Sequence, residues 1–264
     1  MLENFEYKKS LGQNFINDQN IIDKIVKVAG VDKDTLVIEI GPGAGVLSSK
    51  IIPLSKYSIL YEIDTRLEEI LDYNLCKYDN YKIIFNDFLC EDVSLEVKKY
   101  DYKKLYVVAN LPYYITTPII CKITEELNVD KVVIMIQKEV ADRLCAKVNS
   151  KDYGYISAYL NYFYDIKKEF LVSRKCFTPS PKVDSMVISL NRKDRDNKVN
   201  NIELLNRILK DSFKYKRKNL KNNLKGYDLK KIESVLEKHK LNITCRAENI
   251  NIDVFVDIAN ELDK

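Results

Sequence analysis

Short runs of Val, Ile and Leu alternate with stretches of helical spacing through the first two-thirds of the chain, and this alternation constrains the fold more than any other feature. Strands rich in β-branched residues and separated by amphipathic helices indicate βαβ units, which form a parallel sheet with helices on both faces. The expected strands are Leu36–Ile40, Ser58–Glu62, Lys82–Phe85, Leu105–Ala109 and Val132–Ile136. The expected helices lie near 20–29, 45–54, 65–76 and 117–127. A later alternating run, Asp184–Leu190, is expected to pair with the same sheet.

The pattern changes after Leu190, where a charged segment, 191–198, precedes residues with helical spacing. The apolar positions with this spacing are Ile202, Leu205, Ile208, Leu209, Leu229, Ile232, Val235 and Leu236. The sequence therefore predicts an α/β domain over residues 1–194 and a small all-α domain over residues 195–264. Residues 1–190 carry 25 basic and 27 acidic side chains, whereas residues 191–264 carry 18 basic and 12 acidic ones. This uneven charge concerns the partners of the second domain rather than its fold.

Composition excludes several classes of protein. A content of 46% apolar and 31% charged residues is typical of a soluble globular chain. No apolar run approaches the roughly 18 residues of a membrane span, and MLENFEYKK has no signal or transit pattern, so a cytoplasmic location is expected. Six scattered cysteines without a CxxC pair and a single histidine, His239, form no zinc pattern, so no metal is expected. The same shortage of histidine excludes Ser-His-Asp and Cys-His catalysis.

The first expected strand ends in the glycine-rich turn Glu39–Gly45, EIGPGAG. In an open parallel sheet, ligands bind beyond the carboxyl ends of the strands, and glycines there let a ligand approach the backbone. A dinucleotide site requires G-x-G-x-x-G, but after Gly41 and Gly43 this chain has Val46 at the third position. The G-x-G-x-G spacing fits S-adenosylmethionine better, because that cofactor has no phosphate for the turn to bind.

The next two strand ends carry carboxylates. Glu62 ends the second expected strand, where a carboxylate accepts hydrogen bonds from ribose hydroxyls. Asp87 follows the third, where it could accept a hydrogen bond from an adenine amino group. Taken one by one these features are common, but together and in this order they indicate a methyltransferase.

The fourth strand end carries Asn110-Leu-Pro-Tyr-Tyr114, which faces the same crevice. An exocyclic amine on a nucleobase is a poor nucleophile, because its lone pair is delocalised into the ring. Two acceptors, the Asn110 side-chain oxygen and the Leu111 carbonyl, would make that nitrogen more tetrahedral and more nucleophilic. Pro112 stiffens the turn, and Tyr113 offers a ring for a base that has left its stack.

These residues resemble the rRNA adenine N6-dimethyltransferase family, and most closely its bacterial branch that dimethylates two adjacent adenosines near the 3′ end of 16S rRNA. The segment Asn110–Ile119, NLPYYITTPI, resembles the catalytic motif of that family. Ser10–Phe15 resembles its N-terminal motif, which closes over the cofactor, and Cys176–Ser185 resembles its late motif, which faces the target base. Phe213–Leu220 and Arg246–Asn249 resemble segments of its helical C-terminal domain.

The resemblance implies a Rossmann-like class I S-adenosylmethionine-dependent methyltransferase fold, a seven-stranded sheet with an antiparallel last strand. It implies direct displacement of methyl from sulfonium to N6, without a metal, leaving S-adenosylhomocysteine. Catalytic roles carry over to Asn110, Leu111, Pro112, Tyr113 and Phe177, with Tyr113 and Phe177 stacking on the target ring. Cofactor contacts carry over to Asn14, Ile16, Gly41, Gly43, Glu62, Asp87, Phe88 and Asn110.

A basic segment is expected to bind RNA. Residues 207–225 hold eight Lys and Arg side chains against one acid, Asp211. We interpret the segment as a helix that contacts phosphates. The candidate RNA contacts are Lys214, Lys216, Arg217, Lys218 and Lys221. The family usually has paired arginines here, and lysine keeps the charge of arginine without its bidentate fork.

The expected partner is 16S rRNA in the small ribosomal subunit or its precursor, with no membrane contact and a monomeric protein. Two alternatives stay open. One is a 23S rRNA adenine dimethyltransferase that confers macrolide resistance. The other is a nucleic-acid-binding factor that keeps the fold without catalysis, against which the intact Gly41, Glu62, Asp87 and Asn110 argue.

Overall fold

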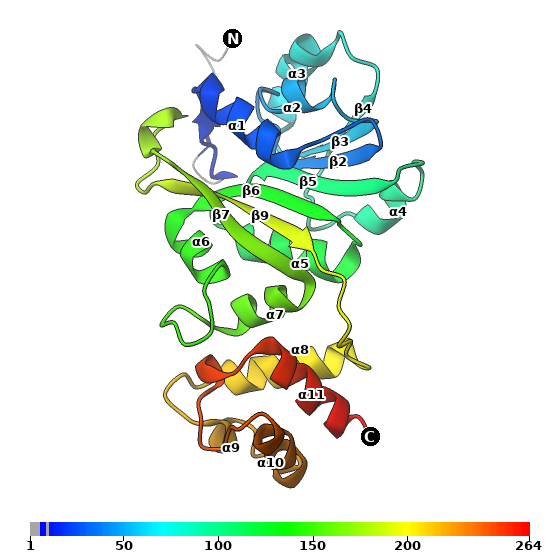
Figure 1. Ribbon diagram of the computed structural model, residues 1–264. Coiled ribbons are helices and arrows are strands. Elements are labelled where there is room, and N and C mark those ends of the chain that lie inside the picture. The colour runs from blue at the N-terminus through cyan, green and yellow to red at the C-terminus, as the bar shows by residue number, and fades with distance from the viewer. Residues whose placement is uncertain (1–5, 9–10) are drawn as a thin grey trace. The chain divides into compact units, whose positions relative to one another are not determined.

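The computed structural model describes residues 6–8 and 11–264 (Figure 1). Its main sheet has seven strands in the order β4-β3-β2-β5-β6-β9-β7. The strands are β2 (Thr35–Ile40), β3 (Tyr57–Glu62), β4 (Tyr81–Phe85), β5 (Lys104–Asn110), β6 (Lys131–Gln137), β7 (Tyr164–Val172) and β9 (Ser185–Arg192). The five predicted strands and the predicted late strand are all confirmed. The edge strand β7, YDIKKEFLV, was not predicted, because its charged residues interrupt any apolar alternation.

Strands β2 to β6 run parallel to one another, and β9 pairs antiparallel with β6. The antiparallel last strand agrees with the expectation drawn from the family. Because β2 to β5 are parallel, their carboxyl ends meet at one edge of the sheet. Every residue of the central strand β2 is buried, which explains its mostly apolar sequence, TLVIEI.

The helices of the chain follow its apolar periodicity. They are α1 (Gln19–Ala29), α2 (Ser48–Ile51), α3 (Glu68–Leu75), α4 (Val93–Val97), α5 (Thr116–Glu126), α6 (Lys138–Leu144), α7 (Tyr155–Phe163), α8 (Ile202–Phe213), α9 (Leu220–Asn223), α10 (Leu229–Lys238) and α11 (Ile252–Leu262). Helix α1 begins after Asp18, whose side chain accepts from the Asn20 amide, and ends at Gly30 in the left-handed conformation. Its isoleucines pack on one face of the sheet, and Figure 1 shows α5 on the opposite face.

The chain divides into two compact units. The sheet unit comprises Met1–Ala141 and Lys167–Arg192, and the helical unit comprises Asp142–Ile166 and Lys193–Lys264. The boundary near residue 192 lies close to the predicted one at 194. Residues 142–166 differ from the prediction, which assigned them to the sheet domain.

The reason for this difference is the core of the helical unit. Tyr153, Ala158 and Tyr159 lie in one buried cluster with Leu205 of α8 and Phe255 of α11. The apolar face of α7 thus packs with the C-terminal helices. None of the helices that the structure describes is long and apolar enough to span a bilayer.

Candidate active site

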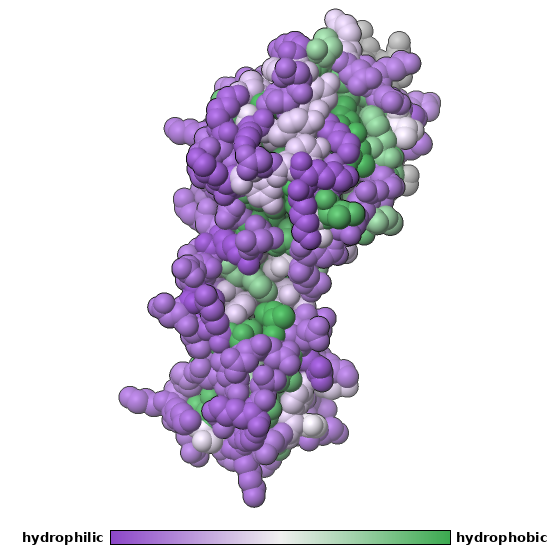
Figure 2. Space-filling model, turned by 90° about the vertical axis from the view of Figure 1, so that its right-hand side faces the viewer, coloured by the Kyte–Doolittle hydropathy of each residue, from purple (hydrophilic) through white to green (hydrophobic). Residues whose placement is uncertain are grey.

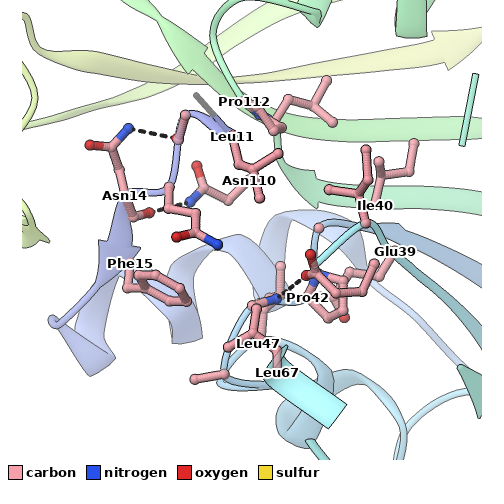
Figure 3. A pocket seen from close by; sticks show the side chains of 18 of the residues that line it. Leu11, Asn14, Phe15, Glu39, Ile40, Pro42, Leu47, Leu67, Asn110 and Pro112 are labelled. Carbon is pink, nitrogen blue, oxygen red and sulfur yellow. Dashed lines mark hydrogen bonds between the residues drawn. The ribbon is translucent and has the colours of Figure 1, made fainter. Parts of the chain in front are cut away.

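A cavity of about 390 Å³ lies beyond the carboxyl ends of β2, β3, β4 and β5 (Figure 3). Five segments form most of its wall: residues 11–17, the turn after β2, the end of β3, Asn86–Phe88 after β4, and Asn110–Ile115 at the end of β5. Gln19 and Ile22 of α1 and Leu67 also line it. The volume falls in the range of pockets that enclose a small molecule. The cavity brings together all the predicted cofactor residues, namely Asn14, Ile16, Gly41, Gly43, Glu62, Asp87, Phe88 and Asn110.

The turn after β2 depends on glycine. Gly41 and Gly43 have φ values of 70° and 61°, in the left-handed region that other residues rarely adopt. The Gly41 amide donates to the Tyr61 carbonyl at 2.8 Å, which ties the turn to β3. A Cβ on Gly41 would meet no atom within 4 Å, so its backbone is open to a ligand, whereas a Cβ on Gly43 would lie 2.8 Å from the Phe15 ring.

Gly43→Ala is therefore expected to destabilise the fold by about 1–3 kcal/mol, from left-handed strain and from contact with Phe15. Because Phe15 lines the cavity, the variant should also bind S-adenosylhomocysteine more weakly. Thermal unfolding with and without that ligand measures both effects. Gly226→Ala is the matched control, since a Cβ there meets no atom within 4 Å. Equal unfolding temperatures for the two variants would show that the Gly43 conformation is not required.

Glu62 is fixed at the end of β3. Its side chain is buried, and its Oε2 and Oε1 atoms accept from the amides of Gly43 and Asp64, each at 3.0 Å. Burial raises the pKa of the Glu62 carboxyl. A carboxylate oxygen has two lone pairs, so each Glu62 oxygen can accept one further bond from a ligand hydroxyl.

The segment after β4 is fixed by the side chain of Asp87. Asp87 Oδ1 accepts from the Leu89 amide at 2.9 Å. The next residue, Phe88, is buried, and its ring meets the Tyr61 ring edge-on at a centroid distance of 5.2 Å. These contacts fix Asp87 and Phe88 in the cavity wall.

Glu39 also belongs to this site, although the sequence analysis assigned it no function. It lines the cavity, it is only 2% exposed, and its Oε2 has no hydrogen-bond partner among the described residues. Burial, with a contribution from the neighbouring charge of Glu62, raises the pKa of the Glu39 carboxyl to about 8. The signal in the sequence was a single charge inside the otherwise apolar strand β2.

The pKa of Glu39 predicts a dependence of stability on pH. The folded pKa is about 8 and the ordinary value is 4.5, so between them the folded state holds a proton that the unfolded state has lost. The free energy of unfolding of the cofactor-free protein should then fall as pH rises through this window, by at most about 1.4 kcal/mol per pH unit from this group. Relative to Glu39→Gln, the wild type should lose stability from about pH 5 to about pH 8 in denaturant titrations. Parallel pH profiles for the two proteins would show that Glu39 ionises normally.

The Asn110 side chain is oriented by the N-terminal segment. Its Nδ2 donates to the main-chain oxygen of Asn14 at 3.0 Å (Figure 3). A carbonyl oxygen can only accept, so this bond fixes which end of the amide is nitrogen. The amide therefore keeps Oδ1 as its acceptor atom in the cavity wall.

The turn after Asn110 is held by backbone bonds. The amide of Leu111 donates to the Met135 oxygen on β6 at 3.1 Å, and the carbonyl of Pro112 accepts from the Ile115 amide at 3.3 Å. The Thr116 hydroxyl also donates to the Pro112 carbonyl, at 3.2 Å. These bonds fix the direction of the main chain at Leu111.

Two tyrosines follow this turn in the cavity wall. The Tyr113 hydroxyl lies 2.6 Å from that of Ser185, a fully buried residue at the start of β9. Burial raises the pKa of the Tyr113 hydroxyl. Tyr114 is 55% exposed, and a Cβ on Gly12 would lie 3.1 Å from its ring. The structure thus places a fixed aromatic ring, Tyr113, in the same cavity wall as Asn110.

Phe177 is placed differently from the prediction. The late motif does meet the N-terminal motif, because β8 (Phe177–Thr178) pairs antiparallel with β1 (Phe15–Ile16). The Phe177 ring, however, is 3% exposed and packs in the core against Ile21 and Ile22 of α1. It is not part of the cavity wall, so stacking on a target base would require its ring to leave this core.

A hydrogen-bond network that the sequence did not predict joins the N-terminal segment to the residues after β3. Gln13 Nε2 donates to Asp64 Oδ2 at 2.6 Å, and Arg66 donates to the same carboxylate. The Arg66 guanidinium lowers the pKa of Asp64 to about 2. This network holds residues 11–17 beside the cavity. Ser10, the first residue of the predicted motif, lies outside the described residues.

The predicted basic helix is not continuous. Helix α8 ends at Phe213, residues 214–218 form a turn, and α9 begins after Asn219, whose side chain accepts from the Asn222 amide. At the end of α8, Asn223 Nδ2 donates to the Ser212 carbonyl at 2.7 Å, which satisfies one of the last carbonyls of the helix. Of the predicted RNA contacts, Lys214, Lys216, Arg217 and Lys218 lie in the turn and Lys221 lies on α9.

Within residues 6–8 and 11–264, no three His, Cys, Asp or Glu side chains are grouped so that they could hold a metal ion.

Comparison with known proteins identifies the family. The family model described as ribosomal RNA adenine dimethylase matches residues 4–264. Ribosomal RNA small subunit methyltransferase A of Bacillus licheniformis is 42% identical, over 98% of this chain and 92% of its own length. The protein of the same name from Clostridium acetobutylicum is 38% identical, over 98% and 95%.

Solved structures agree with the family model. A dimethyladenosine transferase from Plasmodium falciparum superposes with a TM-score of 0.78 and 26% identity, over 92% of this chain and 95% of its own. The 23S rRNA methyltransferase ErmE, at 23% identity, has a TM-score of 0.72 over 95% of this chain and 100% of its own, and shows the shared fold. The predicted class I methyltransferase fold is confirmed. The chain belongs to the ribosomal RNA adenine dimethylase family.

Proposed function

We propose that the protein transfers methyl groups from S-adenosylmethionine to N6 of two adjacent adenosines near the 3′ end of 16S rRNA in the small ribosomal subunit. The products are N6,N6-dimethyladenosine and S-adenosylhomocysteine. The observation that carries the proposal is the Asn110 amide, oriented by Asn14 in the wall of the cavity. Relatives of about 40% identity bear the name ribosomal RNA small subunit methyltransferase A, which supports 16S rather than 23S rRNA.

The residues of the cavity fit the proposed cofactor. The open backbone at Gly41 and the buried carboxyl groups of Glu39 and Glu62 suit a ligand with ribose hydroxyls. When bound, S-adenosylmethionine supplies a methyl group on a sulfonium. We propose that its contacts are Asn14, Ile16, Gly41, Gly43, Glu62, Asp87, Phe88 and Asn110. Among these, Glu62 accepts from the ribose hydroxyls, and Asp87 accepts from the adenine amino group.

The catalytic role of the turn after β5 is to hold the target amine. In the first transfer, Asn110 Oδ1 and the Leu111 carbonyl accept hydrogen bonds from the two N6 hydrogens, and in the second transfer one of them accepts from the single hydrogen that is left. Tyr113 supports the ring of the flipped base. As the nitrogen gains positive charge, the acceptor oxygens stabilise that charge, and the methylated nitrogen then releases one proton to solvent. Pro112 keeps the two acceptors convergent by restricting the turn. The bond from Tyr113 to Ser185 holds its ring in place.

We expect the protein to act as a cytoplasmic monomer and without a metal ion. Two alternatives remain as outcomes of the test: methylation of 23S rRNA, and binding without catalysis.

The test offers purified protein and S-adenosylmethionine to unmethylated small ribosomal subunits and, separately, to protein-free 23S rRNA. Nucleosides from each digest are analysed for N6,N6-dimethyladenosine by mass spectrometry. Dimethylation confined to the small subunit is expected. Modification of 23S rRNA would assign the resistance function, and no modification of either RNA would favour a binding factor.

The basic turn gives a separate prediction about RNA affinity. Neutralising Lys216, Arg217 and Lys218 together should weaken binding to small subunits and make the salt dependence shallower, by about 0.7–0.9 in log–log slope per lost phosphate contact. Affinity measured at several salt concentrations tests this. The matched control neutralises Lys230, Lys231 and Lys238, which removes the same charge from α10. An equal effect of both triple variants would mean that net charge alone is responsible.

A further inference from the structure

Tyr215 is an exposed aromatic residue within the basic turn. Its side chain is 51% exposed, and the ammonium groups of Lys214 and Lys218 lie 5.7 and 4.6 Å from the centre of its ring. Phe213, two residues earlier, packs against the rings of Tyr153 and Phe255. Of the two aromatic residues in this stretch, Phe213 therefore belongs to the core and Tyr215 faces solvent.

The backbone that presents Tyr215 is fixed. Its carbonyl accepts from the Lys218 amide at 2.9 Å and from Asn223 Nδ2 at 3.3 Å, and the same Nδ2 donates to the Ser212 carbonyl at 2.7 Å. These bonds link the end of α8 to α9 through the carbonyl of Tyr215. An aromatic side chain on a fixed backbone loses little conformational freedom when a ligand binds to it.

The turn has a further anchor. Lys216 Nζ donates to the Lys151 carbonyl at 2.8 Å, within the same helical unit. Lys214 and Lys218 instead place their charges beside the ring, on long side chains that can turn toward a nearby anion. The surface thus combines one fixed aromatic plane with two adaptable cations.

On the basis of the proposed rRNA substrate, we propose that Tyr215 stacks on an unpaired nucleobase of that RNA, while Lys214 and Lys218 contact the flanking phosphates. Aromatic rings beside cations are the common means of binding single-stranded nucleic acid, because every base has a π face. Charge complementarity favours RNA over an apolar protein partner, since residues 207–225 hold a single acid. Figure 2 shows a largely hydrophilic surface on the part of the chain at the bottom of its view, where Figure 1 places α8 to α11.

Stacking and phosphate contact differ in their dependence on salt. Base stacking releases no counterions, so its loss lowers affinity by the same factor at every salt concentration, whereas loss of a phosphate contact changes the slope. Removing one stacked ring typically weakens binding by roughly 5- to 150-fold. Tyr215→Ala is thus expected to weaken binding about tenfold with an unchanged slope.

The experiment measures binding of Tyr215→Ala, Tyr215→Phe and wild type to unmethylated small ribosomal subunits at several salt concentrations. Tyr73→Ala is the matched control, because Tyr73 is a 67% exposed tyrosine on α3. For Tyr215→Ala we expect RNA affinity to fall by the same factor at every salt concentration. We expect near wild-type affinity for Tyr215→Phe and no change for Tyr73→Ala. Wild-type affinity of Tyr215→Ala would overturn the proposal, and so would a shallower slope, which would mean that the residue only positions charge.

Two further measurements, the unfolding temperature and the maximal rate of dimethylation, distinguish failure of this proposal from failure of the proposed function. Unfolding temperatures of all variants show whether the turn keeps its fold, and Tyr215→Phe reports on the ring where Tyr215→Ala does not fold. At saturating small subunits, Tyr215→Ala should form N6,N6-dimethyladenosine at the wild-type maximal rate. If wild type itself methylates nothing, the proposed function fails, and the binding data still decide the role of Tyr215.

Discussion

Asn110→Ala is expected to reduce methyl transfer about 100- to 1,000-fold, the effect of removing one group that stabilises developing charge in an active site. The variant loses the Oδ1 atom that we propose as acceptor for the target amine, and it loses the Nδ2 bond to the Asn14 carbonyl. Affinity for S-adenosylmethionine should fall only modestly, because the proposed contacts of Glu62 and Asp87 with the other parts of the cofactor are kept. Single-turnover rates on small subunits and calorimetric cofactor affinities measure the two quantities separately.

The matched control for this variant is Asn74→Ala. Asn74 on α3 also donates one amide bond to a main-chain carbonyl, that of Ala44, at 2.8 Å. It does not line the cavity, so its loss tests the structural part of the Asn110 effect alone. If Asn110→Ala turns over at nearly the wild-type rate, Asn110 does not hold the target amine.

Glu62→Ala is expected to weaken S-adenosylmethionine binding about 10- to 100-fold, as when a hydrogen bond to a charged group worth about 1.5–3 kcal/mol is lost. The maximal rate at saturating cofactor should change much less, because Glu62 lies on β3 and not beside Asn110. Titration calorimetry and the dependence of rate on cofactor concentration test this difference.

The Glu62 variant also leaves two amides, those of Gly43 and Asp64, without their acceptor. Its unfolding free energy without cofactor must therefore be measured alongside. Glu68→Ala is the control, since Glu68 is an exposed carboxylate on the neighbouring helix α3. Unchanged cofactor affinity in a folded Glu62→Ala protein would remove Glu62 from the ribose site.

Much of the sheet and its cavity could be predicted because they depend on local sequence. Buried parallel strands require continuous apolar runs, and their carboxyl ends converge at one edge. The turn at Gly41 and the acceptors Glu62, Asp87 and Asn110 follow directly after such runs, so their convergence in one cavity could be inferred from order alone.

The differences from prediction involve contacts between distant segments. The Phe177 ring packs against α1, a contact that depends on pairing across the chain with Ile16. Residues 142–166 join the C-terminal helices through Tyr153, which precedes α7, and Tyr159, which lies on it, and periodicity within 142–166 cannot show these contacts. The basic segment is divided between α8, a turn and α9, and the bond from Asn223 to Ser212 across this turn cannot be read from a count of charges.

The hydrogen bonds that fix the wall of the cavity could not be predicted from local sequence either. Gln13 and Asp64 are far apart in sequence, yet they share a hydrogen bond of 2.6 Å that holds the N-terminal segment. The orientation of the Asn110 amide likewise depends on a carbonyl at Asn14. The catalytic motif could be recognised from its sequence, but the direction of its acceptor required the structure.

The central claim is that the cavity holds the methyl donor with its reactive end at Asn110. A crystal structure with S-adenosylhomocysteine tests it most directly. We predict ribose hydroxyls within hydrogen-bond distance of Glu62, the adenine ring beside Asp87, and the sulfur atom nearer to Asn110 than to Asp87. A ligand bound outside this cavity, or one with its adenine at Asn110, would contradict the account.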